Sequence, residues 1–211
     1  MMKKRNWILA AFLLSTSMVA LAQKSAEEPK GKAIVQVFGN FHSGFGHAND
    51  DRGFELDRSY LGYQYDLGHG LEVKGVMDIG QSDDVNDFHR IAYIKNAQIS
   101  WRTGKWTLTG GLISNTQFNV QEKFWGYRYV MKSFQDLYKF GNSADLGVSV
   151  AYKFANWISA DAIVVNGEGY KKVQKNDGLM YGLGTTLTPA EGITMRVYYG
   201  LNEGADEMKK D

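Results

Sequence analysis

The sequence predicts an all-β chain that forms a transmembrane antiparallel β-barrel. Three observations lead to this fold class. Apolar and polar residues alternate in many short segments. The connections between these segments are alternately short and long, and aromatic residues gather beside the short ones. The 211 residues are enough for one sizeable domain.

The N-terminus has the three parts of a secretory signal peptide. Residues 3–5 are basic, residues 7–14 are apolar, and residues 20–22 form a small-x-small cleavage site. A membrane-anchor helix is the alternative, but the apolar run is too short to span a bilayer. The expected organisation is a signal peptide over 1–22, a mobile polar segment over 23–32, and a barrel domain over 33–211.

Residues 71–80, "LEVKGVMDIG", illustrate the strand pattern. Successive side chains of a strand point to opposite faces, so this segment has one apolar and one charged face. We expect the apolar face to contact lipid and the charged face to contact water inside the barrel. The segment belongs to a set of nine predicted strands, each about long enough to cross a tilted bilayer: 33–42, 58–67, 71–80, 91–102, 106–113, 145–154, 157–166, 179–187 and 193–200.

The connections distinguish the two ends of the predicted barrel. Four are short and contain turn residues, whereas the connections 43–53, 81–90, 114–144 and 167–177 are long. Short periplasmic turns opposite long outer loops are typical of outer-membrane barrels. The aromatic residues beside the short turns match the girdle found at a membrane interface: Tyr65, Trp101, Trp106, Tyr152, Phe154 and Trp157.

Three charged residues interrupt the alternation. Glu55, Asp57 and Lys95 fall on the apolar phase of their strands. Either they lie near the long-loop end, where an outward charge costs little, or a β-bulge resets the phase.

The strand number predicts a larger barrel than this chain supplies. Bacterial single-chain barrels have even strand numbers, so a barrel with these nine strands requires at least one more strand. We therefore expect this chain to be the N-terminal portion of a larger barrel, with one miscounted strand as the alternative.

Residues 109–154 resemble the phosphate-selective porin (O and P type) family, in the form found in outer-membrane porins of Bacteroides-like bacteria. Residues 54–67 resemble the family's second-strand motif, and residues 164–174 its loop after the seventh strand. The resemblance implies a diffusion channel in a Gram-negative outer membrane, often a homotrimer, with roughly twice the strands predicted here. The phosphate-selective members carry a dense ladder of basic residues that this sequence does not show. Selectivity for phosphate is therefore in doubt, and the implied solutes are small hydrophilic molecules, including anions such as phosphate.

The polar phase of the strands supplies candidate pore-lining residues. Charges of both signs on this phase predict at most a weak ion preference, and opposite charges that pair across strands are the alternative interpretation. The candidates are Arg58, Glu72, Lys74, Asp78, Arg102, Lys153, Asp161 and Arg196.

The connection 114–144 is long and rich in aromatic residues. Residues 130–138 have helical apolar spacing, which predicts a short amphipathic helix. We expect the loop to fold inward and narrow the pore, and a lid or a subunit contact is the alternative. The candidate constriction residues are Lys123, Trp125, Arg128, Lys132 and Phe134.

Other function classes have weaker support. The net charge of +1 and the absence of cysteine give no sign of nucleic-acid binding or of a thiolate metal site. The segment 42–51 contains two His and two Asp residues, which we interpret as a polar loop rather than a metal site. No catalytic motif is recognisable, so we expect no enzyme, cofactor or metal. The main alternative to a porin is a non-conducting barrel used for structure or adhesion.

Overall fold

The computed structural model describes residues 30–44, 52–81, 90–128, 131–175 and 177–203. Within them, nine strands form one antiparallel sheet in chain order, so the all-β prediction and its strands are confirmed. The predicted signal peptide lies outside the described residues. The strands are β1 (Lys30–Ser43), β2 (Arg52–Gly68), β3 (Leu71–Gly80), β4 (Ile91–Thr103), β5 (Trp106–Ser114), β6 (Ala144–Ala155), β7 (Ile158–Val165), β8 (Met180–Ala190) and β9 (Ile193–Asn202).

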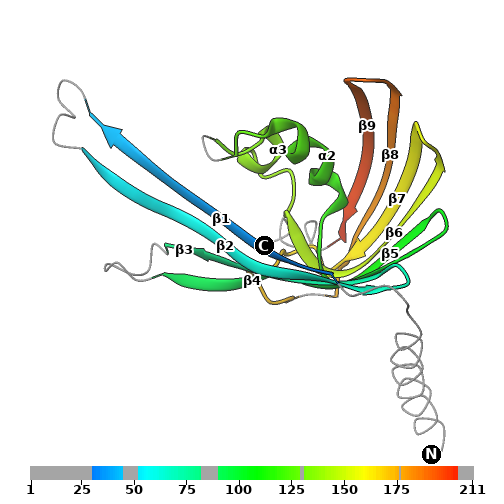
Figure 1. The fold of residues 1–211 in the computed structure, drawn as a ribbon, viewed down its shortest axis with the longest axis horizontal. Coiled ribbons are helices and arrows are strands. Elements are labelled where there is room, and N and C mark those ends of the chain that lie inside the picture. Colours follow the sequence, from blue (N-terminus) through cyan, green and yellow to red (C-terminus); the bar gives the residue numbers. More distant parts are fainter. Residues whose placement is uncertain (1–29, 45–51, 82–89, 129–130, 176, 204–211) are drawn as a thin grey trace, which may run out of the picture.

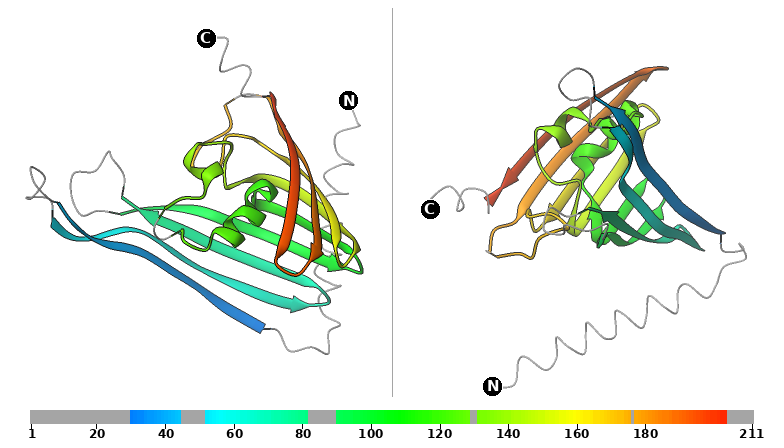
Figure 2. Two further views of the ribbon diagram at one scale, coloured as in Figure 1. Left: turned by 90° about the horizontal axis from the view of Figure 1, so that it is seen from above. Right: turned by 90° about the vertical axis from the view of Figure 1, so that its left-hand side faces the viewer.

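The sheet curves into a trough, and two helices lie in its concavity (Figures 1 and 2). They are α2 (Thr116–Trp125) and α3 (Phe134–Leu137), and α2 contacts β7 and β8. In the part of the chain that the structure describes, neither helix is long and apolar enough to cross a membrane. β1 pairs only with β2, and β9 only with β8, so the described residues form an open sheet and not a closed barrel.

Two-residue turns join the strands along the right-hand and upper rim of the sheet in Figure 1, within the four connections that the sequence predicts to be short. The turn before β3 is tight because Gly70 has a positive φ of 76° and lies against β4. A Cβ atom on Gly70 would lie 2.0 Å from the backbone oxygen of Arg102. The four turns are residues 69–70, 104–105, 156–157 and 191–192.

β-Bulges explain the charges that interrupt the alternation. The β1–β2 register shifts so that Asp57 has no partner, and the β3–β4 register shifts so that Lys95 has none. Each bulge resets the phase of its strand. As a result Glu55 lies opposite Asn40, and Lys95 donates a 2.9 Å hydrogen bond to the hydroxyl of Tyr60. The bulge interpretation is therefore correct.

The two faces of the sheet differ in character. The convex face is apolar and exposed along its whole width; its side chains include Val35, Val37, Leu61, Met77, Ile99, Leu108, Val148, Leu183, Met195 and Val197. The predicted aromatic girdle lies on this face in part, where the Trp106 and Tyr152 rings are 4.5 Å apart. The concave face is mostly polar, but at the long-loop end it also holds a buried apolar cluster: Ile113, Ile163, Val165 and Met180.

Candidate functional site

The concave face of the sheet carries all eight predicted pore-lining residues. Strand register and alternation place their side chains on this side, and Arg196 of β9 contacts α2 from it. Six of the eight residues form three ion pairs: Arg58 with Asp78, Arg102 with Glu72, and Arg196 with Asp161. Much of the charge on this face is therefore neutralised within the wall, as the pairing interpretation expects.

The Arg58–Asp78 pair lies toward the long-loop end of β2 and β3. Asp78 is only 1% exposed, and Arg58 Nε donates to its Oδ1 at 2.6 Å. Arg58 Nη2 donates to the other carboxylate oxygen. Such a two-point contact fixes the position of both side chains.

The Arg196–Asp161 pair also positions α2. Arg196 Nη1 donates to Asp161 at 2.7 Å and to Thr186 Oγ1 at 2.8 Å, and Nη2 donates to the backbone oxygen of Thr116 at 3.0 Å. The helix begins here because the Asn115 side chain accepts a hydrogen bond from Gln117 N. The ion pair therefore connects the sheet to the loop inside it.

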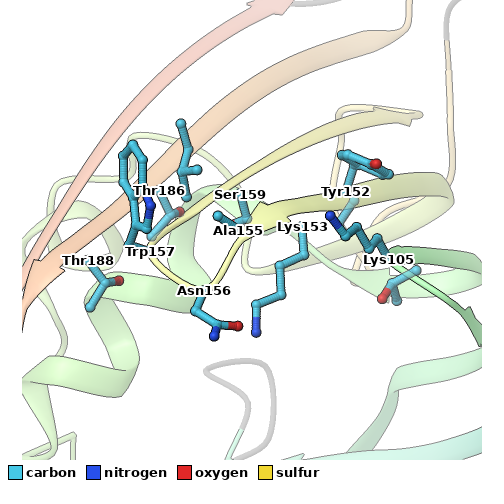
Figure 3. Close-up of a pocket in the computed structure, with 12 residues that line it drawn as sticks. Lys105, Tyr152, Lys153, Ala155, Asn156, Trp157, Ser159, Thr186 and Thr188 are labelled. Carbon is cyan, nitrogen blue, oxygen red and sulfur yellow. The ribbon is translucent and has the colours of Figure 1, made fainter.

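Lys74 and Lys153 are the predicted pore-lining residues that have no ion pair among those found in the described residues. Lys153 lies at a pocket of about 250 Å³ at the short-turn end. Figure 3 shows its side chain beside that of Asn156, next to the turn between β6 and β7. Lys105, on the other side of the pocket, donates to the Phe154 backbone oxygen at 3.0 Å. Lys105 and Lys153 are the charged residues that line the pocket. Among the described residues, no hydrogen bond is found for the Lys153 ammonium.

The candidate constriction loop divides into a packed part and an exposed part. α2 holds Phe118 at 1% exposure, whereas Phe134 in α3 is 61% exposed. Lys123 and Lys132 are exposed, and the Trp125 indole nitrogen donates to Met131 O at 2.7 Å.

Arg128 is paired within the same loop. Its guanidinium donates to Glu122 and, at 3.0 Å, to Asp136. Burial opposes its charge, but Tyr60, Glu122 and Asp136 together raise the pKa of Arg128. The charge of Arg128 is therefore compensated within the loop.

The connection between β7 and β8, predicted as a long loop over 167–177, also contacts the concave face, which the sequence does not indicate. The Tyr170 hydroxyl, in the connection between β7 and β8, donates to Asp78, and Arg58 Nη2 donates to that hydroxyl at 3.0 Å. Burial, followed by the hydrogen bond to Asp78, raises the pKa of Tyr170, so its hydroxyl keeps its proton as a donor. In the sequence, the two glycines of "NGEGY" indicate a sharp turn here. Nothing in the sequence indicates that Tyr170 contacts Asp78 on β3.

The comparisons with known proteins add no family to these observations. No protein-family model matches the chain, and no curated protein is significantly similar to it. The resemblance to the phosphate-selective porin (O and P type) family therefore stays a prediction.

Proposed function

We propose that this chain forms part of an outer-membrane porin in a Gram-negative bacterium, through which small hydrophilic solutes diffuse passively. One observation carries the proposal: the single curved sheet has an exposed apolar convex face and a mostly polar concave face. A soluble sheet buries its apolar face against a core, whereas a membrane barrel turns it toward lipid. The helices here lie on the polar side, so the apolar side has no cover from the described residues (Figure 2).

The open edges support a barrel with additional strands. In lipid, unpaired backbone groups along β1 and β9 would each cost several kcal/mol. Alternate strands of the sheet run in opposite directions, so β1 and β9 run in the same direction. Closure with antiparallel pairs throughout therefore requires an odd number of further strands between these two edges. A larger barrel meets this requirement, and homotrimers of such barrels remain part of the proposal.

A non-conducting structural or adhesion barrel is the second candidate. The three ion pairs across the concave face and the two loops packed on it favour this function, because a closed barrel fills its interior with such contacts. The two candidates differ in whether water and ions pass.

Conductance of the purified full-length gene product in planar bilayers tests the proposal. We expect stepwise ion currents, with reversal potentials that indicate weak charge preference because most wall charges are paired. Membrane fractionation with the signal sequence present should place the protein with outer-membrane lipid. An outer-membrane protein without any conductance would select the structural barrel.

A further inference from the structure

The connection between β7 and β8 forms a second crossing of the concave face, separate from α2. Its base is held on β6, where the Asp145 carboxylate accepts hydrogen bonds from Gly167 N at 2.7 Å and Gly169 N at 3.0 Å. Tyr170 N donates to Ala144 O at 3.0 Å. Asp145 is 4% exposed, so this base is a buried anchor.

Two side chains of this loop contact strands farther along the sheet. The Tyr170 hydroxyl lies between Asp78 of β3 and Arg58 of β2. The Lys171 ammonium lies 4.6 Å from the centre of the Tyr93 ring of β4. β3 and β6 are separated in the sheet by β4 and β5. The backbone of Tyr170 is bound to β6, so the side chains of Tyr170 and Lys171 make the connection to β2, β3 and β4.

We propose that residues 166–171 are a strap that narrows the pore, and that the Tyr170–Asp78–Arg58 contact holds its side chains across the concave face. This inference rests on the porin function proposed above. It assigns to Tyr170 a positioning role: the residue fixes where the strap crosses, and the strap then limits the size of the solutes that pass.

The strap is anchored to the sheet through its backbone and contacts the more distant strands through side chains. Its base has several backbone hydrogen bonds to buried groups, and Asn142 and Asn202 both donate to Gly167 O, at 3.0 and 3.2 Å. Its contacts with β2, β3 and β4 depend on side chains alone, with the Tyr170 hydroxyl as the central contact. Loss of a hydrogen bond to a charged group shifts an equilibrium by roughly tenfold or more.

The test is single-channel recording of the full-length gene product and of its Tyr170→Phe variant, which keeps the ring and removes the hydroxyl. We expect the fraction of time spent in a higher-conductance state to rise roughly tenfold. Tyr199→Phe, on the exposed convex face, is the matched control and should behave as the unsubstituted protein. Heat-modifiable gel mobility confirms that each variant is folded.

A second measurement follows the strap directly. Trypsin cleaves after Lys171 and Lys172, and we expect this cleavage to be faster in Tyr170→Phe than in Tyr199→Phe. Conducting channels with unchanged gating and unchanged cleavage in Tyr170→Phe would overturn the strap and leave the porin function standing. Absence of current in all three proteins would instead reject the porin function and, with it, the strap as a pore element.

Discussion

Arg196 is the residue that attaches the inner loop to the wall of the sheet. It and Asp161 are nearly buried, with side-chain exposures of 10% and 12%. Removal of one partner from a buried pair leaves the other charge without compensation. We therefore predict that Arg196→Met lowers the free energy of unfolding by about 3–5 kcal/mol, measured by urea titration in lipid vesicles.

Arg102→Met is the control for this prediction. The Arg102 side chain is 56% exposed, and Glu72 keeps its 2.8 Å hydrogen bond from Gln64 when the arginine is removed. The Glu72 side chain is 11% exposed, but Gln64 still donates to it and water screens the exposed guanidinium, so the loss should be smaller than for Arg196→Met. Equal losses in the two variants would contradict the structural role of Arg196.

Asp145 organises the base of the strap. Its two carboxylate oxygens accept three backbone hydrogen bonds, from Leu146, Gly167 and Gly169. An amide in its place loses one acceptor oxygen, at a cost of about 1–3 kcal/mol. We predict that Asp145→Asn accelerates trypsin cleavage after Lys171. Mass spectrometry of the digest over time measures the rate of this cleavage.

Asp66→Asn should leave that cleavage unchanged. Asp66 also accepts a turn hydrogen bond, from Gly68 N at 2.8 Å, but it lies at the short-turn end of the sheet. If both variants were cleaved equally fast, the effect would be a general loosening of the fold and not a release of the strap base.

At the scale of elements, two of the short turns contain glycines that have a similar backbone conformation but different surroundings. Gly70 and Gly104 both have positive φ, 76° and 57°. An alanine pays roughly 1–2 kcal/mol in this region at either site. At Gly70 its Cβ would also lie 2.0 Å from a backbone oxygen, whereas at Gly104 nothing lies within 4 Å. We predict a clearly larger loss of folded protein for Gly70→Ala than for Gly104→Ala, measured by heat-modifiable gel mobility after refolding.

The strands were predictable because their signal is local. Side chains two residues apart share a face, so a pattern such as that of residues 71–80 identifies a strand without knowledge of its neighbours. The bulges at Asp57 and Lys95 interrupt the alternation of apolar and polar residues. The sequence alone could not identify them as bulges, because a bulge depends on the register of the partner strand. The contact between Tyr170 and Asp78 joins residues 92 positions apart, and nothing near either residue in the sequence specifies the other.

At the scale of the whole molecule, the ion pairs change the expected character of the concave face. The sequence places both signs on this face but does not determine which charges meet. In the structure Lys74 and Lys153 stay unpaired among the described residues, whereas six of the predicted lining residues neutralise one another. An ion preference would then depend on a few lysines and on where the strap and α2 leave space, so narrow loops and not a charged wall would set selectivity.

The apolar convex face provides the most direct test of membrane insertion. Val148 and Ser149 are neighbours in the middle of β6, and Val148 is 58% exposed on the convex face while Ser149 faces the concave side. An arginine on the lipid side at the bilayer midplane costs about 2–4 kcal/mol, whereas one facing water inside costs little. We therefore predict that Val148→Arg destabilises the protein in lipid vesicles by this amount and that Ser149→Arg does not, as measured by urea unfolding. In a sheet whose convex face met water, an arginine at an exposed position would be tolerated; a harmless Val148→Arg would thus reject the proposal that this face contacts lipid.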